Sequence, residues 1–257
     1  MRTVAATRYV TPLREGGSLP AVVEADDDGM YVMKFRGAGQ GAKALVAEVI
    51  AGELARLLGL PIPEIVLLDL DPDLARTEPD PEIQDLIRAS GGLNVGLDYL
   101  PGAINFDPLV EQPDALLASS IVWFDAFTSN VDRTARNTNL LMWHRKLHLI
   151  DHGAALYFHH DWASAAQAAA SPFTHIAQHV LLPLASRLRE ADAALSTRIG
   201  DDDIERIVAL VPDAWLAGEP AFADAGAHRR AYVEHFCARL RQREAFLGEA
   251  LRAHGHL

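Results

Sequence analysis

The sequence predicts an α+β protein with two lobes, a strand-rich first lobe at residues 1–102 and a mainly helical second lobe at residues 103–257. Short apolar runs separated by turn residues dominate the first lobe, which also contains one long helical pattern. The second lobe is helical in pattern and contains one strand pair. A length of 257 residues suits either one large domain or two closely packed lobes.

Three strands in succession are expected at the start of the first lobe. Residues 8–13 and 19–25 flank a Gly-Gly turn, and an Asp-Gly turn then leads into residues 31–35. Because both connections are short, these runs should form an antiparallel meander. Side chains alternate along a strand, so Val32 and Lys34 should share one face of the third run.

One long helix is predicted at residues 42–58, because Gly59 stands just after its last turn and Pro61 follows. The rest of the first lobe should contain two further strands and a short helix that begins at Asp80-Pro81. These elements are expected at residues 62–70 (strand), 81–88 (helix) and 93–100 (strand).

The second lobe begins with a strongly apolar helix at residues 114–129, with Asp114 as its N-cap. Residues 139–143 and 147–150 should pair as a small hairpin. The Ala-rich stretch at residues 163–170 is interpreted as a helical or mobile insert. Helical patterns follow at residues 174–182, 202–210 and 228–254.

Composition excludes several classes of protein. The net charge of −12 comes without a basic stripe, which argues against general nucleic-acid binding. Cys237 is the single cysteine, so neither an intrachain disulfide nor a cysteine-based zinc site is possible. The first residues lack the apolar core of a secretory signal, and the most apolar stretch, 115–127, is too short to span a bilayer. We expect a cytoplasmic protein without membrane contact.

Lys34 is notable because the chain has only three lysines among its 23 basic residues. A strand lysine usually faces solvent, but this scarcity favours a functional reason for a lysine inside an apolar strand. Glu48 in the following helix is its expected partner, because it lies beside the stripe that should be buried. Glu53 on the same helix is the alternative partner.

Two polar segments in the second lobe complete a pattern. Asp132 is followed five residues later by Asn137, and the hairpin then leads to Asp151. Each residue alone fits a turn. Phosphoryl transfer, however, needs a cation on the phosphates, oxygen ligands for Mg²⁺ and a base beside the acceptor hydroxyl. Together with Lys34 and Glu48, these residues predict a phosphotransferase of protein-kinase-like fold.

On these residues, the chain resembles the HipA-like kinases, relatives of the phosphoinositide-3/4-kinase-like branch of the kinase fold. The resemblance covers roughly residues 8–155, and the helical remainder is compatible with it. Asn130 stands where many protein kinases have the catalytic-loop His, and His152 replaces the Phe of Asp-Phe-Gly. The segments that carry the resemblance are G-G-S-L-P at 16–20, Y-V-M-K-F at 31–35, the helix 42–58 with G-L-P-I-P at 59–63, N-V-D-R at 130–133 with Asn137, and L-I-D-H-G at 149–153.

The resemblance implies that the protein binds a nucleotide, with ATP and Mg²⁺ as cofactors. It assigns the ATP phosphates to Lys34, which Glu48 would position, and the general base to Asp132. It assigns Mg²⁺ to Asn137 and Asp151. The phosphate acceptor, a protein Ser/Thr or a small molecule, is not identified by the sequence.

The resemblance also implies how the rest of the nucleotide is held. A glycine-rich loop would cover the phosphates, and the connector after the last strand of the first lobe would meet the adenine. The residues assigned to the loop are Gly16, Gly17 and Ser18, and those assigned to the connector are Asp98, Tyr99 and Leu100.

Other interpretations stay open at this point. Residues 37–42, G-A-G-Q-G-A, fit the dinucleotide-binding pattern of an NAD(P)-dependent enzyme, although the charged Lys34 inside the preceding strand argues against it. A small-molecule kinase or an ATP-binding pseudokinase regulator would use the same site residues. His175 and His179 are spaced like zinc ligands, but the Glu of a zinc-protease motif is missing, so we interpret them as surface histidines.

Overall fold

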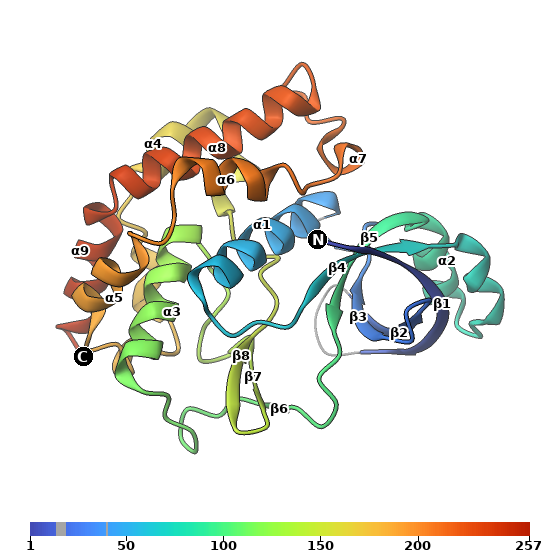
Figure 1. Cartoon of the computed structure of the whole chain (residues 1–257), viewed down its shortest axis with the longest axis horizontal. Coiled ribbons are helices and arrows are strands. Elements are labelled where there is room, and N and C mark those ends of the chain that lie inside the picture. The colour runs from blue at the N-terminus through green and yellow to red at the C-terminus, as the bar shows by residue number, and fades with distance from the viewer. Residues whose placement is uncertain (14–18, 40) are drawn as a thin grey trace.

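A computed structural model describes residues 1–13, 19–39 and 41–257. Five strands form a closed barrel at one end of the molecule, and most of the helices gather at the other end (Figure 1). The expected mixed α+β class is therefore confirmed. The loop predicted at Gly16, Gly17 and Ser18 lies outside the described residues.

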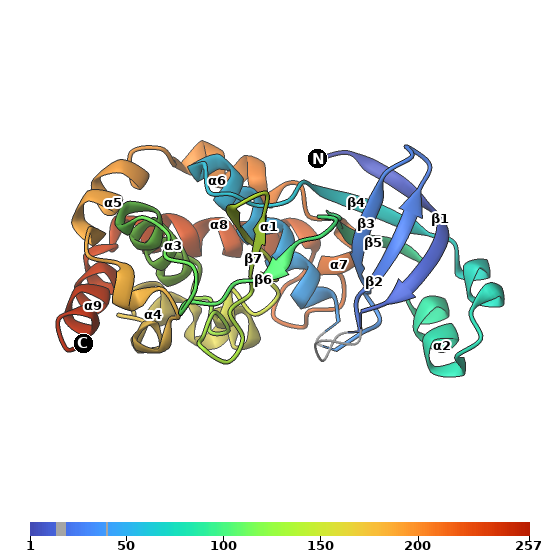
Figure 2. The same cartoon turned by 90° about the horizontal axis from the view of Figure 1, so that it is seen from below.

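The barrel combines predicted and unpredicted strand pairs. Its first three strands form the expected antiparallel meander, and a parallel pairing between the first and fourth strands, which the sequence did not predict, closes the barrel. Figure 2 shows helix α2 (Pro81–Ala89) beside the barrel, away from the other helices. In spatial order the strands are β1 (Thr3–Pro12), β2 (Ala21–Ala25), β3 (Met30–Lys34), β5 (Gly92–Asp98) and β4 (Ile65–Leu70).

Alternation along the strands fills the barrel with an apolar core. Tyr31 and Met33 of β3 are buried in this core, together with Ile83 and Ile87 of α2. Burial of each such side chain stabilises the fold by roughly 1.5–3 kcal/mol. Lys34 lies on the opposite face of β3, as the alternation predicted, and lines a cleft instead of joining this core.

Helix α1 (Ala42–Leu58) has the predicted bounds and packs between the barrel and the C-terminal helices. Gly52 permits a close approach to β4, because a Cβ atom at this position would lie 2.2 Å from Cδ1 of Ile65. Gly59 ends the helix in the left-handed conformation, with φ 79°, as its position predicted.

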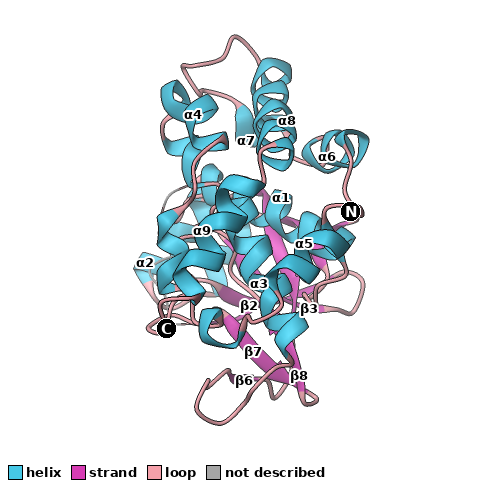
Figure 3. Cartoon of the chain, turned by 90° about the vertical axis from the view of Figure 1, so that its left-hand side faces the viewer, coloured by secondary structure: helices cyan, strands magenta, loops and turns pink. Residues whose placement is uncertain are grey.

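Helix α3 (Ala115–Thr128) lies between α5 (Leu188–Leu195) and α9 (Glu244–His254), in the middle of the helical end of the molecule (Figure 3). It begins where Oδ1 of Asp114 accepts hydrogen bonds from two backbone N–H groups. Its buried rings pack against each other, with 5.4 Å between the ring centroids of Trp123 and Phe127. Such aromatic pairs fix one arrangement of the surrounding helices.

A three-stranded sheet lies below α1, between α3 and the barrel, in the view of Figure 1. Strands β7 (Leu140–Trp143) and β8 (Lys146–Leu149) form the predicted hairpin. The short strand β6 (Ile104–Asn105) pairs with β7 and was not predicted, because a two-residue run has no pattern of its own.

The C-terminal third contains shorter elements than its patterns suggested. The prediction of a helix at residues 174–182 is wrong. A 3₁₀ turn at Thr174–Gln178 ends at His179, whose backbone is extended, and a second 3₁₀ turn begins only at Leu182. The segment predicted as one helix at 228–254 is two, α8 (Ala225–Arg241) and α9, which meet at Gln242 and Arg243. The other helices are α4 (Ala165–Ala169), α6 (Asp201–Val208) and α7 (Asp213–Leu216).

Within the described ranges, every helix is too short or too polar to cross a membrane.

Two glycine substitutions should change stability in opposite directions. Gly59→Ala places a Cβ atom on a left-handed residue and should lower the free energy of unfolding by about 1 kcal/mol. Gly248→Ala, in the open interior of α9, should raise it by up to ~1 kcal/mol, because alanine favours the helix. Urea unfolding of both variants checks the pair, and a stabilised Gly59→Ala variant would contradict the capping assignment.

Candidate active site

A cleft of about 860 Å³ lies between the barrel, the connector after β5 and the loop that precedes β7. Its volume is within the range of small-molecule sites. Six of the residues predicted from the sequence line it, namely Lys34, Asp98, Tyr99, Leu100, Asn137 and Asp151. Residues far apart in the chain therefore meet in one cavity, whereas Glu48 and Asp132, which were also assigned to the site, are not among the residues that line it.

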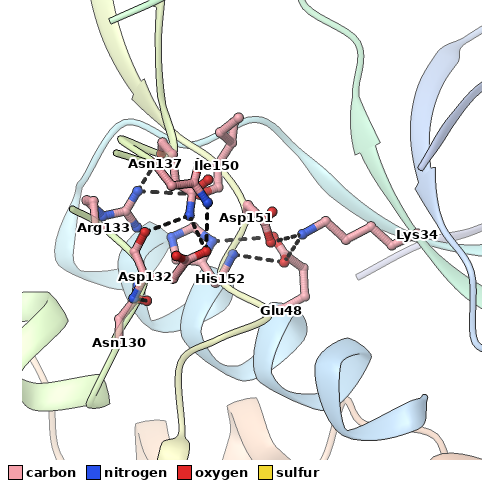
Figure 4. A network of polar contacts seen from close by, with 10 residues as sticks. Lys34, Glu48, Asn130, Asp132, Arg133, Asn137, Ile150, Asp151 and His152 are labelled. Carbon is pink, nitrogen blue, oxygen red and sulfur yellow. Dashed lines mark hydrogen bonds and ion pairs between the residues drawn. The ribbon is translucent and has the colours of Figure 1, made fainter. Parts of the chain in front are cut away.

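Lys34 forms two ion pairs at the inner wall of the cleft (Figure 4). Its Nζ donates to Oε2 of Glu48 on α1 at 2.6 Å and to Oδ1 of Asp151 at 2.5 Å. The side chain of Glu48 is fully buried, whereas 44% of the Asp151 side chain is exposed. The ammonium thus has one fixed partner and one partner that faces the cleft.

The charges in this cluster stabilise one another. Burial alone would raise the pKa of Glu48, but Lys34 and His152 outweigh it and lower that pKa to about 2. Burial alone would lower the pKa of Lys34, but the two carboxylates outweigh it and raise that pKa. Both groups are therefore charged across the physiological range.

Glu48, and not Glu53, is the partner of Lys34. Glu53 pairs with Arg56 on the outer face of α1 at 3.2 Å. Glu48 also accepts a hydrogen bond at 2.9 Å from the backbone N–H of His152. This contact holds the residue after Asp151 against α1, and Asp151 itself has a left-handed backbone with φ 53°. Asp151 is thereby positioned through its neighbour as well as through Lys34.

Asp132 lies in a second group of polar contacts, on the loop between α3 and β7. Its Oδ2 accepts from Nδ2 of Asn137 at 2.7 Å and from Nδ2 of Asn139 at 3.2 Å. Its backbone N–H donates to Oδ1 of Asn130 at 3.1 Å. The five-residue spacing that suggested a shared role for Asp132 and Asn137 therefore corresponds to a direct contact.

A buried carboxylate underlies this loop. Asp125, near the end of α3, is fully buried and accepts from Arg133 Nε at 2.5 Å, from His179 Nε2 at 2.8 Å and from Asn130 Nδ2 at 2.9 Å. Burial alone would raise the pKa of Asp125, but Arg133 and His179 outweigh it and lower it. The same Arg133 donates to the carbonyls of Asn139 and Ile150, so one guanidinium joins the loop to the end of the hairpin (Figure 4).

The interpretation of His179 as a surface histidine was wrong. His179 is buried, and its Nδ1 accepts from the backbone N–H of Leu181 at 3.0 Å, so the proton is on Nε2 and is donated to Asp125. Burial lowers the pKa of His179 despite the nearby carboxylate, which favours this neutral form. His175 is exposed, as expected. Among the described residues, no group of three or more His, Cys, Asp or Glu side chains is placed to hold a metal ion.

Sequence reasoning missed Asp125, Arg133, Asn139 and His179 as members of the site. A signal existed for Asp125, because one acid within an otherwise apolar helix must find partners when it is buried. The partners themselves carry no such signal, since Arg133 and Asn139 are ordinary loop residues and His179 is far away in sequence.

The connector at Asp98, Tyr99 and Leu100 lies where the sequence placed it, at the edge of the cleft. The backbone N–H of Asp98 donates to the carbonyl of Glu64 at 2.8 Å, and that of Tyr99 donates to the carbonyl of Met30 at 2.9 Å. These two bonds fix the connector to the strands of the barrel. Its position relative to the cleft is therefore rigid.

Comparison with known proteins now gives the family. A sequence model of HipA-like kinases matches residues 7–247. The chain belongs to the HipA-like kinase family.

A HipA-like kinase assignment agrees with the fold. The crystal structure of the Helicobacter pylori proinflammatory kinase CtkA is similar over 98% of this chain and 97% of that chain, with a TM-score of 0.55 and 13% sequence identity. At this identity the likeness concerns the fold alone. Comparison with curated proteins gives no match.

The dinucleotide-binding alternative lacks the required strand arrangement. In that fold, the strand before the glycines belongs to a parallel sheet. Here β3 is antiparallel to both of its neighbours, β2 and β5. The described glycines of residues 37–42 form the turn between β3 and α1, where Gly37 N–H donates to Ser90 Oγ at 3.1 Å.

The buried Glu48 carboxylate should make stability depend on pH. Its folded pKa is about 2 against an ordinary value of 4.5, so its contribution is complete above pH 4.5 and is lost as the pH falls toward 2. Glu48→Gln should lower the free energy of unfolding by about 3 kcal/mol at pH 7. The difference from the parent protein should narrow by about 1 kcal/mol at pH 3.5.

Urea unfolding at the two pH values measures this effect. Glu53→Gln is the matched control on the same helix, and it should cost less than about 1 kcal/mol, since its ion pair is partly exposed. An equal loss in the Glu48→Gln variant at both pH values would show that the carboxylate charge has no part in the stabilisation.

Proposed function

We propose that this HipA-like kinase transfers the γ-phosphoryl group of ATP to a hydroxyl acceptor in a Mg²⁺-dependent reaction. The observation that carries the proposal is that Lys34, Asn137 and Asp151 line one cleft, while Glu48 contacts Lys34 and Asp132 contacts Asn137. In this proposal the barrel and the helical end are the two lobes of a kinase, divided near residue 102. A cytoplasmic location, where ATP is available, is part of the same proposal.

The donor set of the cleft fits Mg²⁺. This ion prefers carboxylate and carboxamide oxygens. Asn137 uses its Nδ2 to bind Asp132, which leaves its Oδ1 available, and Asp151 binds Lys34 through Oδ1 alone among the described contacts. Asn137 and Asp151 would hold the ion, which would neutralise charge on the phosphate oxygens.

The two ion-pair partners of Lys34 differ in exposure, and this difference supports the proposal. Glu48 is buried and keeps the ammonium in place, whereas Asp151 is half-exposed and faces the cleft. A phosphate oxygen of ATP can therefore take the place of Asp151 on Lys34 without loss of the inner ion pair. The amine thus binds and orients the nucleotide.

Asp132 is the proposed general base. The amides of Asn137 and Asn139 occupy its Oδ2 and fix the plane of the carboxylate. Its Oδ1 can then accept the proton of the acceptor hydroxyl as the new P–O bond forms. The bond between the γ-phosphorus and the bridging oxygen breaks, and ADP leaves with that electron pair. Acceptors of protein and small-molecule classes are both compatible with this chemistry.

Lys34 and Asp132 should fail differently when they are changed. Lys34→Ala should weaken ATP binding and lower turnover, and Lys34→Arg should not restore either, because a flat guanidinium does not replace a compact ammonium. Asp132→Asn should leave ATP affinity nearly unchanged but reduce turnover by ~10²–10⁴-fold. ATP affinity and ADP release, measured side by side, test the two roles.

Normal turnover of the Asp132→Asn variant would remove the base from the mechanism. Arg189→Met is a suitable control for both variants, because Arg189 is exposed and lies outside the residues that line the cleft.

Asp151→Ala should remove the dependence of nucleotide affinity on magnesium. The residue is half-exposed, so the fold should be retained. Calorimetric titration with ATP over a magnesium series measures the effect, with Asp98→Asn as a second carboxylate change in the same cleft. A magnesium dependence that is unchanged in Asp151→Ala and lost in Asp98→Asn would reverse the metal assignment.

A further inference from the structure

Arg136 has a position in the cleft that the proposed mechanism does not yet use. It lies four residues after Asp132 and directly before Asn137, and it is one of the residues that line the cleft. Lys34 and Arg136 are the two cations among the described residues that line it. Lys34 is already compensated by two carboxylates, whereas Arg136 has no ion pair or hydrogen bond from its side chain within the described part of the chain.

The backbone of Arg136 is fixed even though its side chain is exposed. Thr134 N–H donates to the carbonyl of Asn137 at 2.9 Å, which closes a turn with Arg136 at its corner. The turn is held on its inner side by a bridge between Thr134 and His179, and by the bond from Val180 N–H to the carbonyl of Arg133 at 3.0 Å. The guanidinium therefore extends from a rigid support and can adjust to a ligand.

The carboxylates around the cleft outnumber its cations, so a phosphate ligand would need a further positive charge. Lys34 carries one positive charge beside the carboxylates of Glu48, Asp151 and, on the neighbouring loop, Asp132. A nucleoside triphosphate adds further negative charge to this surplus. A guanidinium presents a planar fork that matches two phosphate oxygens and is strongest where its charge is otherwise uncompensated.

We propose that Arg136 binds the terminal phosphate of the nucleotide and stabilises the phosphoryl group as it is transferred. This inference rests on the proposed phosphotransfer function and adds a residue to it. Because Arg136 is adjacent to Asn137 and on the same loop as Asp132, its guanidinium would reach the phosphates from the acceptor side. Lys34 is on the opposite wall, and the two cations would enclose the γ-phosphate.

The test compares two ligands that differ only in this phosphate. ADP and an ATP analogue with a non-hydrolysable β–γ bridge are titrated calorimetrically with saturating Mg²⁺ against the full chain. Arg136→Met keeps most of the side-chain volume and removes the charge. It should weaken analogue binding about 10-fold and leave ADP binding within about 2-fold, as expected for loss of a charge-assisted contact. Arg136→Lys should be intermediate.

Arg189→Met is the matched control, and it should change neither affinity, because Arg189 is an exposed arginine away from the cleft. Equal weakening of ADP and analogue in Arg136→Met would overturn the assignment, since the contact would then be to a shared part of the nucleotide. Unchanged affinity for both ligands would overturn it as well. If the parent protein binds the analogue, the proposed function stands, whatever the result for Arg136. If the parent protein binds neither ligand, both proposals are wrong.

Discussion

The buried carboxylate of Asp125 is the constraint on which the site depends. A charge with no exposed surface is tolerated inside a protein only when its hydrogen-bonding capacity is met by charged or polar partners. Asp125 obtains three, and all three come from segments that follow α3 in the chain. Arg133 and Asn130 fix the loop that carries Asp132, and His179 fixes the segment beneath it. A displaced loop would take Arg133 and Asn130 away from this carboxylate, which favours the observed position of the loop.

Glu48 has the corresponding role on the opposite wall of the cleft. Each of the two buried acids is paired with one cation and one histidine. Asp125 is paired with Arg133 and His179. Glu48 is paired with Lys34 and His152. The two sets are joined through consecutive residues, because Arg133 donates to the carbonyl of Ile150 and Lys34 binds the next residue, Asp151. The exposed polar groups of the cleft are thus supported from both sides by charges that water does not reach.

Much of this arrangement could be predicted from the sequence, where local patterns determine the outcome. The bounds of α1, the cap at Gly59, the β7–β8 hairpin and the positions of Lys34, Asp132, Asn137 and Asp151 all follow from short-range spacing. Pairings between distant segments could not be predicted in this way. The parallel β1–β4 pair joins residues some 60 positions apart, and nothing in residues 3–5 indicates it. His179 was misjudged for the same reason, because its only signal is the distant Asp125.

Arg239 and Lys34 show how the different chemistry of arginine and lysine suits different roles in this protein. Arg239 is fully buried and has no carboxylate partner among the described residues. It donates to the carbonyls of Phe127 and Ala126 at the end of α3 and to those of Ala168, Ala169 and Ser171. Burial lowers its pKa to about 10, so it remains charged, and its five-donor fork ties α8 to the end of the helix from which the Asp132 loop starts. A guanidinium suits such a permanent link to several acceptors. The ammonium of Lys34 is compact and binds Glu48 and Asp151 through separate contacts. In the proposed reaction it would exchange Asp151 for a phosphate oxygen while Glu48 stays bound.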